Sequence, residues 1–335
     1  MLVRLRRYSL SDSKITRSVI ILTLSRLVVN MTRRFTYPFI PTISRQLDVP
    51  ISSVQSIIAL QSSSGLISPI VGPWADRFGA KRVAAQMVLL IAGSALITAA
   101  VPQIWMFTLA MVIFGISKSS FDPAAYAYLG NTVPYNKRGT MIGILELSWA
   151  VSLLIVAPLA GFLLSVSNDS SILPLMVDLN HLPTLSFSGT LGLQLTLITL
   201  GILSIVAYVA IQTGIPRAKS QSQAQNVMTP LSALRVIRKS PAAIAVVVYN
   251  ILLTTANEIF FINYGIFMEA QYGLALTALG SVTMVISLAE FSGEISVIGL
   301  ADRFGKRRMA LGGAFVSSIM YILLPLVTIS LPVTL

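Results

Sequence analysis

One five-residue sequence occurs twice in this chain, each time in a short polar stretch between two long apolar runs. Residues 75–79 and 301–305 both read Ala-Asp-Arg-Phe-Gly, and a basic pair follows each copy after one further residue. A repeat that contains charges, at equivalent places in an otherwise apolar chain, is typical of a duplicated membrane bundle. The repeat therefore favours a polytopic helical membrane protein with two related halves over a soluble fold.

The composition agrees with a chain that faces lipid. Of the 335 residues, 55% are hydrophobic and 11% are charged, which is far from the composition of a soluble domain. There is no Cys and one His, which argues against a thiolate nucleophile or a zinc site. The net charge of +12 does not indicate nucleic acid, because most Lys and Arg flank apolar runs. We expect contact with the lipid bilayer, no metal, no cofactor, no nucleic acid and no enzymatic activity.

Nine apolar runs are long enough to cross a bilayer, which takes about 20 residues. They lie near residues 16–40, 52–74, 83–101, 105–131, 140–164, 189–212, 242–267, 276–299 and 309–329. The first run carries Arg26, Arg33 and Arg34 and has no small-residue cleavage site, which favours an uncleaved helix over a signal peptide. The expected fold is all-α, with a six-helix bundle in 1–212, a cytoplasmic linker in 213–241 and a partial bundle of three spans in 242–335.

The basic residues also predict the orientation. The N-terminus, the links 75–82, 132–139 and 300–308, and the linker hold 19 of the 24 Lys and Arg residues. These segments all fall on one side of the predicted membrane, and that side is cytoplasmic by the positive-inside rule. We expect a multi-pass protein of the cell membrane with a cytoplasmic N-terminus.

The two hairpins resemble the signature of a known family, the major facilitator superfamily of secondary transporters. The first copy resembles the signature of loop 2–3 through Gly72, Asp76, Arg77, Gly79, Lys81 and Arg82. The second resembles its echo in loop 8–9 through Asp302, Arg303, Gly305, Arg307 and Arg308, although Ile298 replaces the first Gly. The resemblance implies two halves of six helices each, of which the second stops here after three, so the chain is either a fragment or a shortened variant.

The resemblance also implies that the hairpins act as cytoplasmic clasps during transport. Asp76 would then pair with a base at the end of the fourth run, for which Arg138 is the nearest residue. In the family the first hairpin also docks on helix eleven, for which this sequence shows no run. The residues themselves allow a simpler interpretation, in which Gly79 permits a tight reversal and Lys81 and Arg82 contact lipid headgroups.

Ionisable residues inside the bilayer are costly, so each needs water or a partner. On the first run, one helical face is polar and is expected to line a central cavity, with Arg26, Asn30, Arg33 and Tyr37. The alternative for Arg33 and for Arg34, at the margin of this face, is that they snorkel to the outer headgroups.

The fourth and fifth runs add further charges. Lys118 and Asp122 are four residues apart and are expected to form an ion pair, which is either structural or part of a binding site. Glu146 has no partner nearby in sequence and is a candidate for reversible protonation. The alternative is a fixed ion pair with Arg26 or Lys118. The sequence 157–161, Ala-Pro-Leu-Ala-Gly, resembles the Gly-Pro-rich element of antiporters in the superfamily, which favours efflux.

The seventh and eighth runs contribute a matching polar set in the second half. Asn250 and Asn257 share a face of the seventh run, and Glu258 lies beside it, where it is a possible partner of Arg33. On the eighth run, Glu290 is deep enough to titrate or to form a pair.

The sequence thus predicts a secondary transporter of small solutes that works by alternating access, with proton coupling and export as the favoured mode. The alternative is a non-transporting membrane protein, such as a sensor, a partner subunit or an inactive remnant. Because the predicted cavity contains both positive and negative groups, the charge of the substrate stays open, as does the choice between monomer and oligomer.

Overall fold

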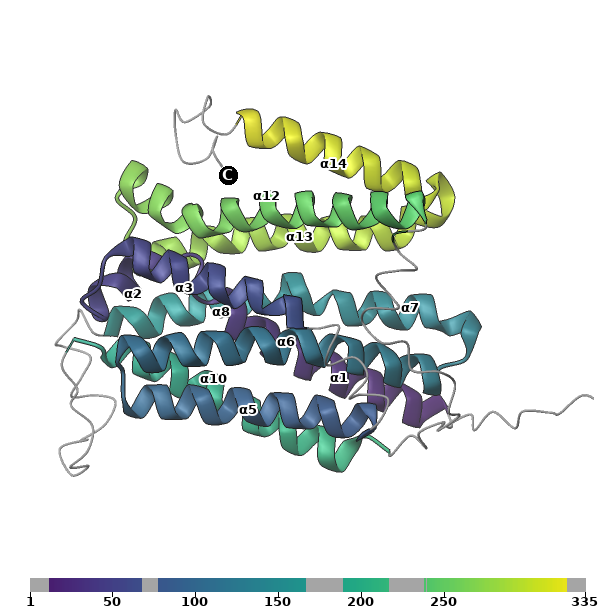
Figure 1. Ribbon diagram of the computed structural model, residues 1–335, viewed down its shortest axis with the longest axis horizontal. Coiled ribbons are helices and arrows are strands. Elements are labelled where there is room, and N and C mark those ends of the chain that lie inside the picture. The colour runs from purple at the N-terminus through teal and green to yellow at the C-terminus, as the bar shows by residue number, and fades with distance from the viewer. Residues whose placement is uncertain (1–11, 68–77, 167–188, 217–237, 239, 324–335) are drawn as a thin grey trace, which may run out of the picture. The chain divides into compact units, whose positions relative to one another are not determined.

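The computed structural model describes residues 12–67, 78–166, 189–216, 238 and 240–323, and these fold into helices joined by short turns (Figure 1). No strand occurs within these ranges. The helices are α1 (Asp12–Arg34), α2 (Ile40–Gln46), α3 (Ile51–Ser63), the 3-10 turn η1 (Ser64–Ile67), α5 (Ala80–Ala100), α6 (Ile104–Thr132), α7 (Tyr135–Glu146), α8 (Ser148–Ser165), α10 (Leu191–Gly214), α12 (Pro241–Tyr272), α13 (Leu276–Phe304) and α14 (Lys306–Leu323).

Seven segments in the described part of the chain are long and apolar enough to cross a membrane. They are Ser13–Arg34, Ala80–Ala100, Ile104–Thr132, Lys137–Ser165, Leu191–Gly214, Pro241–Tyr272 and Leu276–Val297. This confirms the expected all-α, polytopic fold. The predicted spans 52–74 and 309–329 both extend into residues outside the described ranges, so their full lengths stay predictions.

The first predicted span is wrong at its end. The run 16–40 was expected to be one helix, but α1 ends at Arg34 and residues 35–39 form turns before α2. Two prolines explain the break, because Pro38 disfavours helical backbone in the residue before it and Pro41 lies in the first turn of α2. Tyr37 is therefore on a turn and not on the helical face of Arg26.

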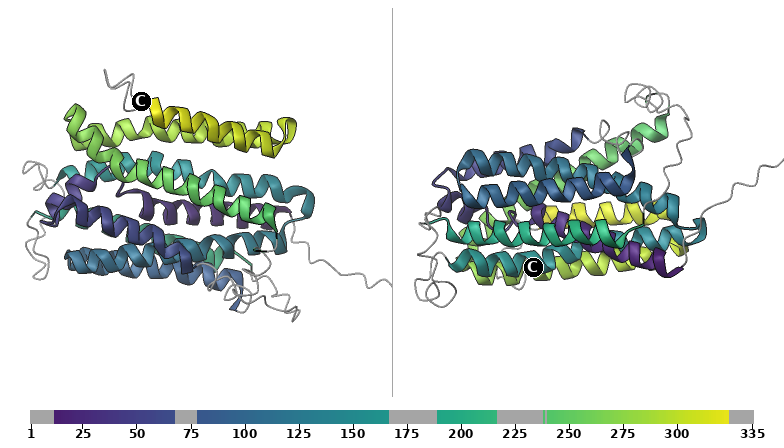
Figure 2. Two further views of the ribbon diagram at one scale, coloured as in Figure 1. Left: turned by 45° about the horizontal axis from the view of Figure 1, so that its top comes forward. Right: turned by 90° about the horizontal axis from the view of Figure 1, so that it is seen from below.

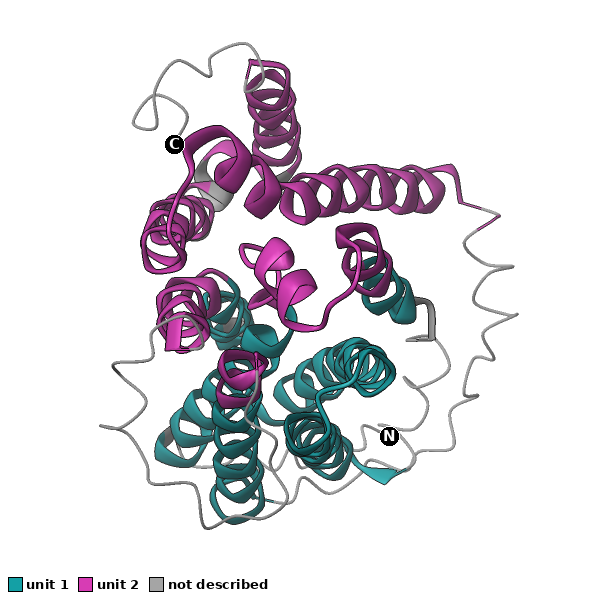
Figure 3. Ribbon diagram, turned by 90° about the vertical axis from the view of Figure 1, so that its left-hand side faces the viewer, with its two compact units in different colours: residues 1–33, 59–149, 197–227 teal, residues 34–58, 150–196, 228–335 magenta. Residues whose placement is uncertain are grey.

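The chain forms two compact units, each described here by itself (Figure 3). The first comprises residues 1–33, 59–149 and 197–227, and the second 34–58, 150–196 and 228–335. The expected division into 1–212, a linker and 242–335 concerns the repeat in the sequence, and it stays a prediction.

In the first unit, α5 and α6 pack against each other along much of their length (Figures 1 and 2). Both helices bury small side chains, among them Ala84, Ala92 and Ala95 on α5 and Ala110 on α6. Small residues let helix backbones approach closely. In lipid, association of apolar helices gains little from the hydrophobic effect, so this close packing is a main source of attraction between them. The buried charged residues of this unit are Arg26 on α1 and Lys118 on α6.

In the second unit, α8 and α13 meet at two glycines. A Cβ added to Gly280 would lie 2.6 Å from the carbonyl oxygen of Ala157, and one added to Gly161 would lie 2.8 Å from that of Leu276. The same unit brings α2 against α12, and α12 and α14 against α13. These close crossings fix the helices that hold Glu258 and Glu290.

The two repeated glycines have the same backbone conformation. Gly79 precedes α5 with φ of +89°, and Gly305 separates α13 from α14 with φ of +87°. Positive φ is open to glycine at little cost, so each copy of the repeat can reverse the chain at this residue. The sequence repeat is therefore also a repeat of local structure.

Candidate functional site

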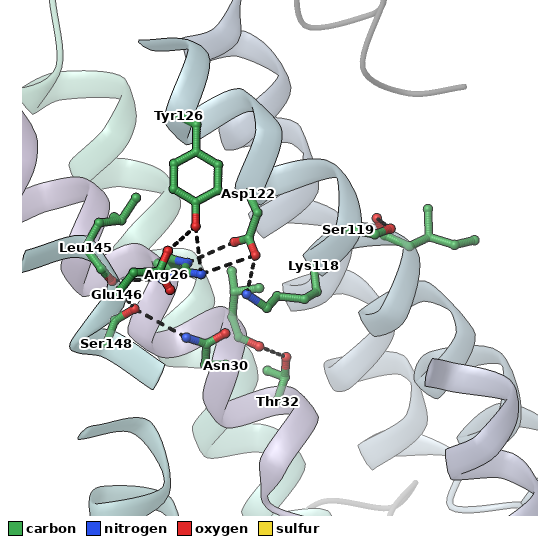
Figure 4. A network of polar contacts seen from close by, with 12 residues as sticks. Arg26, Asn30, Thr32, Lys118, Ser119, Asp122, Tyr126, Leu145, Glu146 and Ser148 are labelled. Atoms are coloured by element: carbon green, nitrogen blue, oxygen red, sulfur yellow. Dashed lines mark hydrogen bonds and ion pairs between the residues drawn. The ribbon is translucent and has the colours of Figure 1, made fainter. Parts of the chain in front are cut away.

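The polar centre of the first unit is organised around Arg26 on α1 (Figure 4). Its Nε donates to Asp122 Oδ1 at 3.0 Å, and its Nη1 donates to Glu146 Oε2 at 3.0 Å. Its Nη2 donates to the hydroxyl of Tyr126 at 3.2 Å. The Arg26 side chain is only 5% exposed, so a planar group with five donors lies buried among acceptors from α6 and α7.

Lys118 completes a four-charge cluster with Arg26, Asp122 and Glu146. Its Nζ donates to Asp122 Oδ2 at 2.5 Å, so the ion pair expected within α6 is present. Two cations and two carboxylates then balance, which offsets the cost of holding buried charge. Glu146 pairs with Arg26, one of the two partners considered for it, and its reversible protonation stays a prediction.

Two members of this network were missed in the sequence. The hydroxyl of Tyr126 donates to Glu146 Oε1, and Ser148 Oγ accepts from Asn30 Nδ2 at 3.3 Å. The spacing of Asp122 and Tyr126 by four residues on α6 was a usable signal for the tyrosine. Nothing in the sequence marked Ser148, because its bond with Asn30 joins residues 118 positions apart.

Arg33 and Lys118 share one aromatic neighbour, Trp149. The guanidinium carbon of Arg33 lies 6.0 Å from the centre of the Trp149 ring system, and Lys118 Nζ lies 5.7 Å from it. Arg33 also donates to Ser62 Oγ at 3.3 Å. An indole face attracts cations, so Trp149 stabilises two positive groups without neutralising them.

In the second unit, Arg34 is paired and does not snorkel to headgroups. Its Nη2 lies 2.8 Å from each carboxylate oxygen of Glu290, and the Arg34 side chain is 0% exposed. The ring of Phe261 lies 5.2 Å from its guanidinium carbon. The alternative that Arg34 reaches the outer headgroups is therefore wrong, because Glu290 on α13 supplies its counter-charge.

Glu258 accepts a hydrogen bond from a residue of the same unit, Tyr37, whose hydroxyl is 3.0 Å from Oε2. The Tyr37 ring stacks on Phe261 with centroids 5.3 Å apart. Asn257 accepts from the hydroxyl of Tyr321 at 3.3 Å, and Asn250 donates to the carbonyl of Val246 within its own helix. The pairing of Arg33 with Glu258 stays a prediction.

The signature hairpins are described only in part. Gly72, Asp76 and Arg77 lie outside the described residues, and so do the side chains of Asp302 and Arg303. Arg138, the expected partner of Asp76, donates from Nε to the carbonyl of Val133 at 3.0 Å. In the second copy, Arg307 and Arg308 are exposed. The clasp itself therefore stays a prediction.

Lys81 has a role that the sequence did not suggest. Its Nζ donates to the carbonyls of Gln212 at 2.8 Å and Ile215 at 2.6 Å, at the end of α10. The last carbonyls of a helix lack helical partners, and a cation there also interacts favourably with the helix dipole. Lys81 thus caps α10, whereas its neighbour Arg82 is exposed.

Within the described ranges, no group of three or more His, Cys, Asp or Glu residues is arranged to hold a metal ion. The chemistry that the observed cluster can carry is the making and breaking of ion pairs and hydrogen bonds. Its four charges come from α1, α6 and α7, so the state of one carboxylate affects three helices.

The fold and these paired buried charges define a polytopic helical membrane protein with a polar interior. The chain belongs to the Major Facilitator Superfamily, whose family model matches residues 22–335. Members of this superfamily are transporters, in agreement with the expectation that the chain is not an enzyme.

Two curated relatives match parts of the chain. An uncharacterized MFS-type transporter, YwfA, of Bacillus subtilis (strain 168) is 27% identical over 128 residues, which are 38% of this chain and 31% of the relative. The multidrug resistance protein MdtG of Citrobacter koseri is 34% identical over 139 residues, 38% of this chain and 32% of the relative. The matched regions thus span about a third of each relative's length.

Solved structures show the same fold. A bacterial homologue of the human lysosomal transporter Spinster, in an inward-facing and unoccupied conformation, superposes with a TM-score of 0.66 at 15% identity, covering 88% of this chain and 64% of that one. A D-xylose–proton symporter superposes with a TM-score of 0.66 at 16% identity, covering 92% and 74%. At these identities the likeness concerns the fold alone.

Proposed function

We propose that this chain is a secondary transporter of small molecules that works by alternating access and is coupled to protons. The observation that carries the proposal is the unequal exposure of the partners of Arg26. The guanidinium side chain is 5% exposed, whereas Asp122 is 22% and Glu146 40% exposed. A proton can therefore reach a carboxylate whose counter-ion is buried.

Protonation of Glu146 would change the charge of the cluster by one unit. The cluster is balanced when both carboxylates are ionised, and it becomes positive when Glu146 is neutral. Because buried charge is costly, this change gives a driving force for rearranging α1, α6 and α7 or for accepting a negative group. A transporter that links proton movement to a conformational change needs such a response.

The direction and the wider organisation are part of the same proposal. The favoured direction is efflux, supported by the multidrug resistance proteins among the relatives and by the Pro-containing element 157–161. The proposed location is the cell membrane with a cytoplasmic N-terminus, supported by the distribution of Lys and Arg. The halves 1–212 and 242–335 would move against each other around the linker 213–241, with the two signature hairpins as clasps.

The proposed substrate and proton path draws on residues of each unit. In the first unit it includes Arg26, Asn30, Arg33, Lys118, Asp122 and Glu146. In the second unit it includes Tyr37, Asn250, Asn257, Glu258 and Glu290.

A second candidate is a non-transporting membrane protein, such as a sensor. It is favoured by the fact that Glu146 is engaged by both Arg26 and Tyr126, as expected of a static structural core. The two functions differ in whether a ligand crosses the membrane, so a flux measurement separates them.

The decisive experiment uses the full chain in proteoliposomes, with ethidium as a fluorescent probe and an imposed pH gradient. The wild type should move ethidium when the gradient is applied, and Glu146→Gln should lose this movement while its thermal unfolding midpoint stays close to wild type. Glu269→Gln is the matched control, because Glu269 pairs with Arg45, whose side chain is 58% exposed. Full retention of gradient-driven transport in Glu146→Gln would overturn the coupling role, and ethidium binding without flux in the wild type would favour a sensor.

A further inference from the structure

Helix α10 ends at a proline, which leaves one of its last carbonyls without a helical donor. The amide of Ile215 still bonds to the carbonyl of Ile211. The next residue, Pro216, has no N–H, so it cannot donate to the carbonyl of Gln212 four residues before it. The last turn of α10 therefore needs donors from elsewhere in the chain.

Lys81 supplies donors to this turn from the start of α5. Its Nζ donates to the carbonyls of Gln212 at 2.8 Å and Ile215 at 2.6 Å. Within its own helix Lys81 is badly placed. The first turn of α5, which the structure describes in full, also contains Arg82 and no acidic residue, and positive charge at a helix N-terminus opposes the helix dipole. A residue that breaks a local rule in this way has its reason in a contact or a function outside its helix.

Two further helices hold the end of α10. The hydroxyl of Tyr128 on α6 donates to the carbonyl of Pro216 at 3.2 Å, and Ser18 Oγ on α1 lies 3.4 Å from the same hydroxyl. Tyr128 and Ser18 are each 1% exposed. Gly214 lies so close to α1 that an added Cβ would overlap the side chain of Ile21. Contacts from α1, α5 and α6 thus converge on the last turn of α10, and all of them lie within the first unit.

Two of these helices also hold the four-charge cluster. On α1, Arg26 lies eight residues after Ser18. On α6, Tyr126 lies two residues before Tyr128, and its hydroxyl contacts both Arg26 and Glu146. Rigid helices can carry coupling between distant groups, because each moves as one body. The cluster and the end of α10 are therefore connected through α1 and α6.

We propose that the last turn of α10 is a docking point that makes the start of the linker respond to the charge cluster, with Lys81 and Tyr128 as its positioning residues. The linker 213–241 begins in this turn. When Glu146 changes its charge, α1 and α6 rearrange, and the docked turn passes the change to the linker. The contact of Lys81 differs from the proposed clasps because it joins two helices of the first unit. This inference rests on the proposed proton coupling.

The first test measures hydrogen exchange of the backbone amides of residues 211–215 in the full chain in lipid nanodiscs, at one pH. Lys81→Met should speed this exchange about tenfold, the change expected when one hydrogen bond from a charged group is lost. Tyr128→Phe keeps the buried ring and should speed it about fivefold, as for a neutral hydrogen bond. Arg82→Met is the matched control, because it removes the neighbouring charge, which is exposed, and should exchange as wild type does. Wild-type exchange in Lys81→Met would overturn the docking point.

The second test addresses the connection to the cluster. Glu146→Gln should alter exchange over 211–215, whereas Glu269→Gln, which breaks the exposed pair with Arg45, should not. If Glu146→Gln loses transport while this exchange is unchanged, the connection is overturned and the proposed coupling stands. If it keeps transport while this exchange is altered, the proposed coupling fails and the connection stands as a structural one.

The third test measures transport in proteoliposomes with ethidium as the probe. Lys81→Met should lower the maximal rate about fivefold, within the range for changes that weaken coupling, and leave the half-saturating concentration unchanged. Lys81→Arg, which can still donate to both carbonyls, should recover most of the rate. Lys14→Met is the control, because Lys14 is an exposed lysine whose side chain takes no part in the docking point. A wild-type rate in Lys81→Met would overturn its positioning role.

Discussion

The buried pair of Arg34 and Glu290 makes a quantitative prediction. Replacing Glu290 by Gln keeps the shape of the side chain but removes the counter-charge of a guanidinium whose side chain is 0% exposed. Removing one partner of a buried pair costs about 3–5 kcal/mol, because the remaining charge is buried without compensation. At about 2 °C per kcal/mol, the low end for large domains, the thermal midpoint should fall by about 6–10 °C.

The assay is thermal unfolding of the purified chain in detergent, and a double variant makes it specific. Arg34→Met combined with Glu290→Met should recover most of the loss, because apolar residues of similar volume often replace a buried pair at little cost. Glu269→Gln breaks the exposed pair with Arg45 and should change the midpoint by about 2 °C or less. The reasoning is refuted if Glu290→Gln is as stable as wild type, or if the double variant is less stable than Glu290→Gln.

Two further predictions concern contacts within the second unit. Gly265→Ala should lower the thermal midpoint, because the added Cβ would lie 2.1 Å from the backbone oxygen of Pro38. Gly293→Ala is the control, because its added Cβ would have nothing within 4 Å, and it should gain up to about 1 kcal/mol of helix propensity. Equal midpoints for the two variants would contradict this reasoning. Arg45→Cys with Glu269→Cys should cross-link through a short bismaleimide, because their side chains meet at 2.6 Å in a chain without other cysteines. Non-reducing gels after proteolysis would show it, and no linked product would argue against the contact.

Much of the fold follows from local features of the sequence. The predicted spans 105–131 and 276–299 differ from the helical spans Ile104–Thr132 and Leu276–Val297 by a few residues at most, because an apolar run of bilayer length has few alternatives to a helix. The Lys118–Asp122 pair was also predictable, since both residues lie on one helix at the spacing of a turn. The reversal of the chain at Gly305 was predictable as well, because glycine adopts positive φ at little cost and Gly305 has φ of +87°.

The partners of the buried charges were decided by tertiary structure. Arg34 is 256 residues from Glu290, and Arg26 is 96 residues from Asp122, so no periodicity in the sequence connects them. Lys81 caps a helix end 131 residues away, which no local feature of the sequence indicates. The sequence by itself determined where most of the long apolar helices lie, because a segment buried in lipid must satisfy its backbone hydrogen bonds within itself. Only packing between segments decided which charges neutralise each other, because that depends on which helix faces meet.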